Sequence, residues 1–417
     1  MVNGTKTVIL GFDAVSPLGT EIDVQWTRAV AGESGIGPLT RFLTDETFPI
    51  RIAGQVDDID NLNYPFLKPR YLALWPSPIF KYALLTVHRA LLHSGIDITP
   101  DLGPRVAVTY SSAVGGQDVL IRSDRRMVSD GKLPPPYTNP NSCINMVGGK
   151  VSILTGASGP ITATVSACAT GLTSMLAGIM LLSAGKADVA ICGAVDFALV
   201  APIVAGFATM NAAFVARPDE AADLPALASR PFSLNRRGFV ISEGAGAIIL
   251  ATDAFARAHG LKWAIEIAGW SMTGDAHHFV APNLSTVQRC MAESIQDARI
   301  SPGDIHAVNA HATSTRTGDR VEYDALKAVF GHRLPPVTAN KSLIGHAMGA
   351  SSAIESIFAI EGMMRSVLLP TINYTPDPEM ELDVVSDGPR NMDQEFVLKN
   401  AFGFGGCNAC VVFKRVG

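Results

Sequence analysis

The chain has 417 residues, of which 47% are apolar, 17% charged and 7% aromatic, so it can bury a large core and is neither disordered nor fibrous. Its formal net charge is −5, and its 33 basic and 38 acidic residues form no long run of one sign, which argues against nucleic acid as a partner. The 38 glycines, together with many Ala, Val and Ile, favour closely packed strands and helices over linkers.

Short runs of β-branched residues alternate with helical stretches rich in Ala and Leu, which predicts an α/β fold. A helix that ends at Gly260, followed by a new strand, indicates two halves, 1–257 and 258–417. The predicted strands cover 7–12, 105–110, 187–192 and 245–251, and the predicted helices cover 22–31 and 254–260.

Two segments bear on the location of the protein. Residues 1–19 predict a strand and a turn, without an apolar stretch of signal-peptide length, so we expect a cytoplasmic protein. Residues 197–216 are the most apolar, but they contain Pro202, Gly206 and Asn211 and have no basic flanks. We therefore expect them to be buried in the protein and not to span a membrane.

Common cofactor motifs are missing from the chain. No GxxxxGK[ST] phosphate loop and no complete GxGxxG dinucleotide fingerprint occurs, and 269–274 misses the spacing of a serine nucleophile elbow by one residue. Cys407 and Cys410 have CxxC spacing, but no second ligand pair lies nearby. We therefore expect structural thiols there and no metal.

The segment 161–185 predicts a strand, a turn of small residues that holds Cys168, and an uncharged helix. The free N–H groups and the dipole of a helix start stabilise a thiolate, so a reactive thiol with a lowered pKa is one interpretation. A buried structural cysteine is the other, and the segment alone favours it.

Two histidines lie among small residues in the carboxyl-terminal part of the chain. His311 follows a short apolar run and precedes hydroxyl residues and a glycine, and His346 follows Lys341 by five positions. Each histidine by itself fits a structural role. Together with a cysteine at a strand-to-helix turn, they suggest a Cys/His/His site.

Three glycines surround Phe404 in the segment 400–408. Such a loop either forms a tight hairpin turn or offers backbone N–H groups to an oxyanion, and the local sequence favours neither.

Taken in order, these motifs resemble the β-ketoacyl-acyl carrier protein synthase family over nearly the whole chain. The Cys, His, His order resembles the elongating enzymes and not the initiating ones. The resemblance implies a thiolase-like fold, five-layered αβαβα with two similar halves, in a homodimer whose interface lies near the nucleophile strand. The motifs are VSPLG (15–19), AGESGIGPLTRF (31–42), VSACATG (165–171), RPFSLNRRGFVISEGAGA (230–247), NAHATSTRTGD (309–319), NKSLIGHAMGA (340–350) and NAFGFGGCN (400–408).

The resemblance also implies a role for each catalytic residue. Cys168 is the expected acylated nucleophile, and His311 and His346 are expected to stabilise the enolate that forms when a malonyl thioester loses CO₂. Lys341 and Glu322 are expected to support the histidines.

Further residues are implied around this set. Asp319 is expected in the network of the histidines, and Phe404 is expected to gate the pocket. The backbone N–H groups of Phe404 and Cys168 are expected to form the oxyanion hole, with Gly403 and Gly405 beside them.

The implied activity is that of an elongating 3-oxoacyl-[acyl-carrier-protein] synthase of fatty acid biosynthesis, with no metal and no organic cofactor. Its partner is an acyl carrier protein bearing acyl and malonyl groups, which Arg70, Arg125 and Arg126 are candidates to dock. One alternative is a condensing enzyme of specialised, polyketide-like metabolism. Another is a non-catalytic chain-length partner subunit, against which the presence of Cys168 argues.

Three positions depart from the family pattern: Ala312 stands where Gly is usual, Arg237 where Asp is common, and Cys407 where Thr is common. The Cys/His/His set is complete despite them. Substrate preference stays open, and we expect residues within 111–117 and 207–214 to line the pocket.

Overall fold

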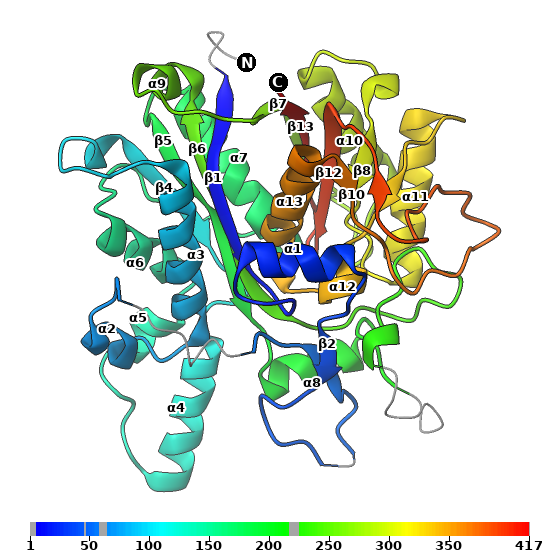
Figure 1. Cartoon of the computed structure of the whole chain (residues 1–417). Coiled ribbons are helices and arrows are strands. Elements are labelled where there is room, and N and C mark those ends of the chain that lie inside the picture. Colours follow the sequence, from blue (N-terminus) through cyan, green and yellow to red (C-terminus); the bar gives the residue numbers. More distant parts are fainter. Residues whose placement is uncertain (1–5, 46, 58–64, 217–224, 417) are drawn as a thin grey trace.

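The computed structural model describes residues 6–45, 47–57, 65–216 and 225–416 (Figure 1). The strands of its large sheet follow the order β4-β5-β6-β1-β7-β13-β12-β8-β9. Those of the amino-terminal half are β1 (Thr7–Val15), β4 (Val106–Ser111), β5 (Val189–Phe197) and β6 (Glu243–Thr252). Those of the carboxyl-terminal half are β7 (Ile265–Gly274), β8 (Ala307–Asn309), β9 (Val337–Thr338), β12 (Phe396–Gly403) and β13 (Cys407–Arg415).

The two halves of the large sheet repeat one pattern of strand pairing. In the amino-terminal half β4 and β5 are parallel, whereas β5–β6 and β6–β1 are antiparallel. In the carboxyl-terminal half β8 and β12 are parallel, whereas β12–β13 and β13–β7 are antiparallel. The halves meet where β1 and β7 share the pairs Thr7–Ile267, Val8–Glu266 and Ile9–Ile265. The predicted duplication is therefore present in the backbone.

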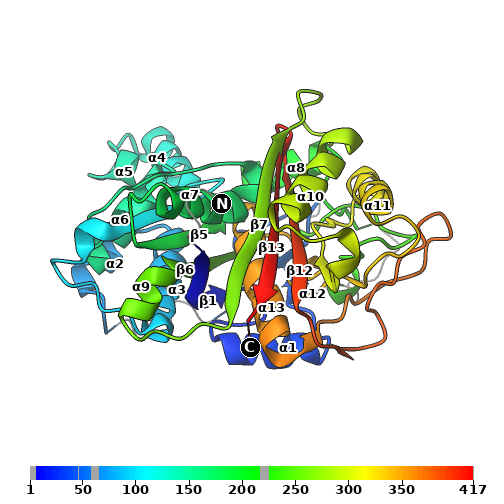
Figure 2. The ribbon, with the colours of Figure 1, turned by 90° about the horizontal axis from the view of Figure 1, so that it is seen from above.

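Helices form three layers around the two half-sheets (Figure 2). In the middle layer, α7 (Thr170–Ser183) and α13 (Met348–Arg365) pack against each other and against strands of both halves. The outer layers are α3 (Pro78–Ser94) with α6 (Met146–Thr155), and α10 (Leu284–Asp297) with α11 (Arg316–Phe330). This arrangement confirms the thiolase-like, five-layered αβαβα fold.

Shorter elements lie in the connections. Two small ribbons pair β2 (Ile36–Pro38) with β3 (Ile52–Gly54) and β10 (Val367–Leu368) with β11 (Arg390–Asn391). The remaining helices are α1 (Ile22–Val30), α2 (Pro69–Leu74), α4 (Gln117–Asp130), α5 (Thr138–Ser142), α8 (Ala201–Thr209), α9 (Asp253–Ala258) and α12 (Lys341–Ile344).

The apolar region 197–216 forms the end of β5, α8 and the loop after it. Within the described ranges, no helix is both long and apolar enough to cross a bilayer. The expected burial is only partly observed, because Met210 and Val215 are exposed while Val204 and Ala208 are buried.

Small residues let the two central helices meet near their amino-terminal ends. A Cβ on Gly171 of α7 would lie 2.5 Å from the backbone nitrogen of Ala353 in α13. A Cβ on Gly349 would lie 2.7 Å from the Cβ of Thr170. Because glycine permits this close approach, the turns that precede α7 and α13 come together at one end of the middle layer.

The strand predicted before Cys168 is shorter than the sequence indicates. In the described chain, Ile161 forms one bridge with Val108 of β4, and the ladder does not continue. Beyond it, the hydroxyl of Ser111 donates to the Thr164 carbonyl at 2.5 Å, so a side chain replaces the ladder hydrogen bond. The segment then leaves the sheet edge and leads into the turn with Cys168.

Candidate active site

Cys168 lies in a single 3-10 turn, Ala167–Ala169, directly before α7. Ala167 has φ +47°, a left-handed conformation that an L residue adopts only under restraint. The restraint includes β12, because a Cβ on Gly403 would lie 2.2 Å from the Ser166 carbonyl oxygen. The turn of the nucleophile and the end of β12 are thus in direct backbone contact.

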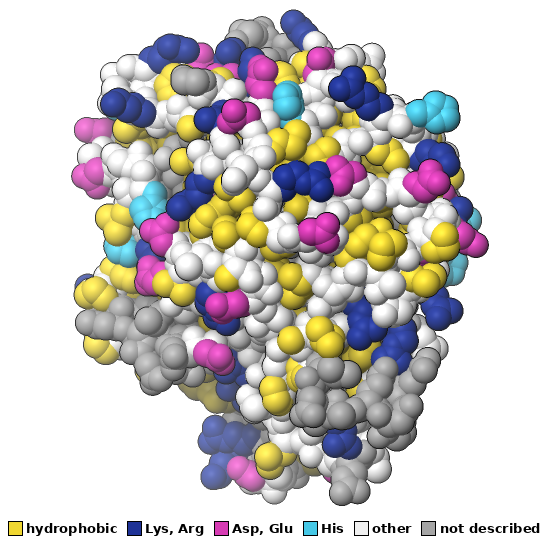
Figure 3. Space-filling model, turned by 45° about the vertical axis from the view of Figure 1, so that its right-hand side comes forward, with side chains coloured by type: hydrophobic (Ala, Val, Ile, Leu, Met, Phe, Trp, Pro, Cys, Tyr) yellow, Lys and Arg dark blue, Asp and Glu magenta, His cyan; other side chains and the backbone are white. Residues whose placement is uncertain are grey.

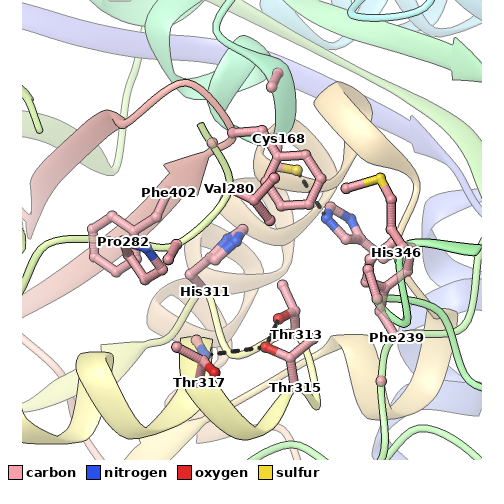
Figure 4. Close-up of a pocket in the computed structure, with 18 of the residues that line it drawn as sticks. Cys168, Phe239, Val280, Pro282, His311, Thr313, Thr315, Thr317, His346 and Phe402 are labelled. Carbon is pink, nitrogen blue, oxygen red and sulfur yellow. Dashed lines mark hydrogen bonds between the residues drawn. The ribbon is translucent and has the colours of Figure 1, made fainter. Parts of the chain in front are cut away.

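His346 contacts the thiol directly (Figure 4). Its Nε2 lies 3.1 Å from Cys168 Sγ, and its Nδ1 lies 2.9 Å from the hydroxyl of Ser351 on α13. His346 is only 1% exposed and its ring packs edge-on to Phe239. The imidazole is therefore held at both nitrogens and aimed at the sulfur.

The thiol and the imidazole are both neutral at rest. Burial raises the pKa of Cys168 to about 11, and the smaller effects of the Lys341 charge and of the Phe404 backbone N–H only partly oppose it. Burial also lowers the pKa of His346 well below its ordinary value of 6.5. The interpretation of a thiol with a lowered pKa does not hold for the resting site, because desolvation outweighs the favourable backbone N–H groups.

His311 follows β8, and its ring lies across the cavity from His346 and Phe239 (Figure 4). Its ring centroid is 5.9 Å from that of His346 and 5.6 Å from that of Phe402. Its Nδ1 is buried without a hydrogen-bond partner among the described residues. Burial lowers the pKa of His311 well below 6.5, so the ring is a neutral group with unused hydrogen-bonding capacity.

Lys341 and Glu322 hold the backbone of the His311 loop and not the imidazole rings. Lys341 Nζ donates to the His311 carbonyl at 2.6 Å. Glu322 on α11 accepts the N–H groups of His311 at 2.9 Å and Ala312 at 2.7 Å, and also the Asn400 side chain at 3.0 Å. The structure therefore brings together Cys168 and the four other residues expected to be catalytic.

Asp319 lies outside this group. Its carboxylate accepts the backbone N–H of Phe232 at 2.7 Å and faces Arg236 at 4.0 Å. Burial raises the pKa of Asp319 to about 7. The Asp319 carboxylate thus binds the 230–238 loop, whereas Glu322 on the next turn of α11 binds the His311 loop and its charge helps to raise the pKa of Asp319. The role of Asp319 in the network of the histidines stays a prediction.

The glycine-rich segment is the hairpin turn between β12 and β13, with Gly405 at φ +82°. The N–H of Gly405 donates to the Phe279 carbonyl at 2.8 Å. Phe404 and Gly403 line the cavity, and the Phe404 N–H bonds the Cys168 thiol. The hairpin interpretation of this segment is therefore confirmed, and the donation of its N–H groups to an oxyanion stays a prediction.

The cavity in front of the thiol has a volume of about 650 Å³. Its wall includes the apolar side chains of Phe207, Phe239 and Met348. The residues after His311 add hydroxyl groups and charge to this wall. The lining residues within the predicted segments 111–117 and 207–214 are Ala113, Val114, Phe207, Met210, Asn211 and Ala212, and the wall also contains Arg237, Thr313, Thr315, Arg316 and Thr317.

Sequence reasoning missed three buried charged residues around the site. Asp196, at the end of β5, accepts the N–H of Gly349 at 2.7 Å and that of Val114 at 2.8 Å, which fixes the start of α13. A lone acid at the end of an apolar strand was the available signal. Glu355 and Lys399 carry the other charges, and no motif pointed to either.

The basic residues considered for docking lie on other elements. Arg70 is on α2, and Arg125 and Arg126 are on α4; all three are exposed and none lines the cavity. Basic and acidic side chains are interspersed over the face seen in Figure 3. In the described ranges, no cluster of three His, Cys, Asp or Glu side chains suits a metal ion.

Comparisons with known proteins show the family of the chain. Family models match residues 5–256, as the β-ketoacyl synthase N-terminal domain, and residues 264–375, as its C-terminal domain. The chain belongs to the β-ketoacyl synthase family. Membership confirms the predicted resemblance and an acyl-transferring, condensing activity.

Relatives of this family member match over their whole length. It is 34% identical to 3-oxoacyl-[acyl-carrier-protein] synthase 2 of Staphylococcus aureus, over 100% of this chain and 99% of the relative. It is also 34% identical to the enzyme of that name from Coxiella burnetii, over 99% of each chain.

Solved structures of synthases share the fold. A β-ketoacyl synthase from Burkholderia phymatum has a TM-score of 0.90 and 29% identity, with 99% of this chain and all of that one covered. A type II polyketide ketosynthase solved with its acyl-carrier protein and a hexaketide has a TM-score of 0.89 and 26% identity, over 99% and 100% of the chains.

Proposed function

We propose that this synthase elongates acyl chains by transferring an acyl group to Cys168, decarboxylating a malonyl thioester and condensing the two to a 3-oxoacyl thioester. The observation that carries the proposal is the 3.1 Å contact between Cys168 Sγ and His346 Nε2, beside the unpartnered His311 ring in one cavity. Relatives named 3-oxoacyl-[acyl-carrier-protein] synthase 2 support the elongating type.

In the first half-reaction Cys168 Sγ attacks the carbonyl of the acyl thioester. Because the thiol is neutral at rest, its proton passes to His346 Nε2 as the new C–S bond forms. The bond to the donor thiol breaks, and that leaving thiolate takes the proton from His346. The N–H groups of Phe404 and Cys168 stabilise the oxyanion of the tetrahedral intermediate.

In the second half-reaction a malonyl thioester occupies the cavity beside the acyl-Cys168. Its C–C bond to the carboxylate breaks, CO₂ leaves, and the electron pair forms an enolate whose oxygen accepts hydrogen bonds from His311 and His346. For this step His346 takes the neutral tautomer with its proton on Nε2, in which Nδ1 accepts from the Ser351 hydroxyl. The enolate carbon then attacks the acyl carbonyl. A new C–C bond forms, and the Cys168 thiolate leaves and takes up one proton from solvent through His346.

We propose an acyl carrier protein as the donor of both thioesters, and no metal or organic cofactor in either step. The ketosynthase solved with its acyl-carrier protein supports such a partner. The carrier's pantetheine arm lies along Thr313 and Thr315, and Arg237 and Arg316 in the same wall suit its phosphodiester. Arg70, Arg125 and Arg126 stay candidates for docking the carrier itself.

We also propose a homodimer and a division of the chain into 1–257 and 258–417. The exposed apolar side chains of Ile161 and Val165, at the sheet edge next to the nucleophile turn, support an interface there. The connection between α9 and β7, which separates the repeated strand patterns, supports the division.

A condensing enzyme of polyketide-like metabolism is the second candidate function. The polyketide ketosynthase with a TM-score of 0.89 favours it, as does Arg237 in the cavity wall, where the family pattern has Asp. A non-catalytic partner subunit is disfavoured because Cys168 and its two histidines are all present.

Acylation of Cys168 tests the proposed function. The protein is incubated with carrier proteins that bear acyl groups of several chain lengths. It is then digested, and acylated cysteines are located by mass spectrometry, with Cys168→Ala as the control. Acylation confined to Cys168 supports the proposal, and the preferred donor separates fatty from polyketide starters. Folded protein that takes no acyl group from any donor contradicts it.

A further inference from the structure

A buried charge cluster of Lys341, Glu355 and Lys399 lies behind the His311 loop. Glu355, on α13, and Lys399, on β12, are both 0% exposed. One oxygen of Glu355 accepts from Lys341 Nζ at 2.5 Å and the other from Lys399 Nζ at 2.7 Å. Neither Glu355 nor Lys399 is among the described residues that line the cavity, so neither touches a substrate there.

A second buried lysine is costly, since desolvation of an ammonium costs several kcal/mol unless the charge is paired. Lys341 alone already balances Glu355. The charge of Lys399 is balanced by Glu322, and Asn400 connects the two side chains. The backbone carbonyl of Asn400 accepts a hydrogen bond from Lys399 Nζ at 2.9 Å, and its side-chain amide donates one to Glu322 at 3.0 Å. Two lysines and two carboxylates thus flank the loop.

These two lysines and two carboxylates contact successive backbone groups of the His311 loop. Lys399 Nζ lies 3.5 Å from the Ala310 carbonyl, and Lys341 Nζ lies 2.6 Å from that of His311. Glu322 accepts hydrogen bonds from the N–H groups of His311 and Ala312. Ala312 has φ +22°, a conformation that persists only where neighbours enforce it. The His311 ring has no partner at Nδ1, so its orientation depends on this loop.

We propose that Lys399 is a positioning residue for the decarboxylation step: with Glu355 it fixes the His311 loop and adds positive charge behind the forming enolate. This inference rests on the proposed condensation. After burial, Lys341 and Lys399 both lower the pKa values of His311 and His346, which keeps the two rings neutral. The lysine that acts on the pKa of Cys168 is Lys341. Lys399 lies against the Ala310 carbonyl of the His311 loop, and it acts on the first half-reaction only through the pKa of His346, so its main effect falls on the second half-reaction.

Lys399→Met tests the inference, because it removes the charge, keeps the length of the side chain and leaves Glu355 paired with Lys341. The matched control is Lys414→Met, on the adjacent strand at the far, partly exposed end of the same hairpin. Two rates are measured: acylation of Cys168 by acyl-carrier protein, and release of CO₂ from malonyl-carrier protein.

We expect Lys399→Met to slow CO₂ release roughly tenfold, less than the 10²–10³-fold typical for loss of a direct oxyanion donor. Acylation falls by a smaller factor than CO₂ release does, because Lys399 acts on the Cys168–His346 pair only through the pKa of His346. The acid limb of the pH profile for CO₂ release moves to higher pH, because the histidine pKa values rise when the nearby cation is removed. Lys414→Met changes none of these.

Wild-type CO₂ release with an unmoved acid limb in Lys399→Met overturns the inference, and so does an equal loss in both half-reactions, which marks a purely structural role. If Lys399→Met does not fold, Lys399→Gln, which retains a donor toward Glu355, takes its place. NMR titration of the wild-type histidines needs no variant: an ordinary pKa for His311 also overturns the inference. Failure of the wild-type chain to acylate Cys168 contradicts the proposed function itself.

Discussion

Replacing Gly403 by alanine should disable the nucleophile without touching any reacting group. The added Cβ would lie 2.2 Å from the Ser166 carbonyl oxygen and 3.3 Å from the Cys168 backbone nitrogen. Since Cβ contacts below 3.0 Å essentially never occur, β12 and the Cys168 turn must separate by at least ~0.8 Å. A displacement of about 1 Å at a reacting group costs about 10²-fold in rate, so acylation of Cys168 should fall by about that factor.

Rapid-quench measurement of acyl-Cys168 formation, with thermal unfolding recorded for the same samples, checks this prediction. Gly149→Ala on α6 is the matched control, because nothing lies within 4 Å of the added Cβ and an alanine favours a helix. Gly405→Ala adds backbone strain at φ +82° in the same turn without a clash. A Gly403→Ala variant that acylates at the wild-type rate with unchanged stability refutes the close contact between β12 and the nucleophile turn.

Three further predictions concern the histidines, the strained loop and pH. His346→Ala removes the proton acceptor of Cys168 and should slow acylation at least about 10²-fold in the same quench assay, whereas an unchanged rate contradicts the proton transfer. Ala312→Gly relieves a positive φ and should raise the free energy of unfolding in denaturant by up to about 1 kcal/mol; a loss of stability would show that φ +22° is unstrained. Burial raises the pKa of Asp319 from 3.8 to about 7, so its contribution to stability is present below pH 3.8 and lost as pH rises through 7. Asp319→Asn should flatten that fall in unfolding experiments from pH 4 to 8, and an unchanged slope contradicts the assignment.

The residue types of the site could be predicted from the sequence, since Cys168, His311 and His346 each lie among small residues in a segment that precedes a helix. That these three residues lie together in space could not be predicted. Cys168 and His346 are 178 positions apart, and they approach because Gly171 lets α7 contact α13 at Ala353. Neither the spacing of apolar residues along the chain nor the local helix propensity predicts such a contact between two helices.

Charges buried behind the site were also beyond local reasoning. Lys399 stands in a strand whose other residues are mostly apolar, and it is tolerated because Glu355 on α13 and, through Asn400, Glu322 on α11 lie close to it. The sequence left the direction of the Cys168 pKa shift open for a related reason. A helix start favours a thiolate where water reaches it, whereas this one lies under the β12–β13 turn and is desolvated.

The most direct test of the proposed chemistry combines both half-reactions in one assay. Purified protein is first acylated by acyl-carrier protein. Malonyl-carrier protein labelled in its free carboxyl group is then added, and labelled CO₂ and 3-oxoacyl product are measured in the same samples. Equal amounts of CO₂ and product in the wild type, with product abolished in Cys168→Ala, is the expected result. CO₂ without product in the wild type, or product in Cys168→Ala, contradicts condensation through an acyl-Cys168 thioester.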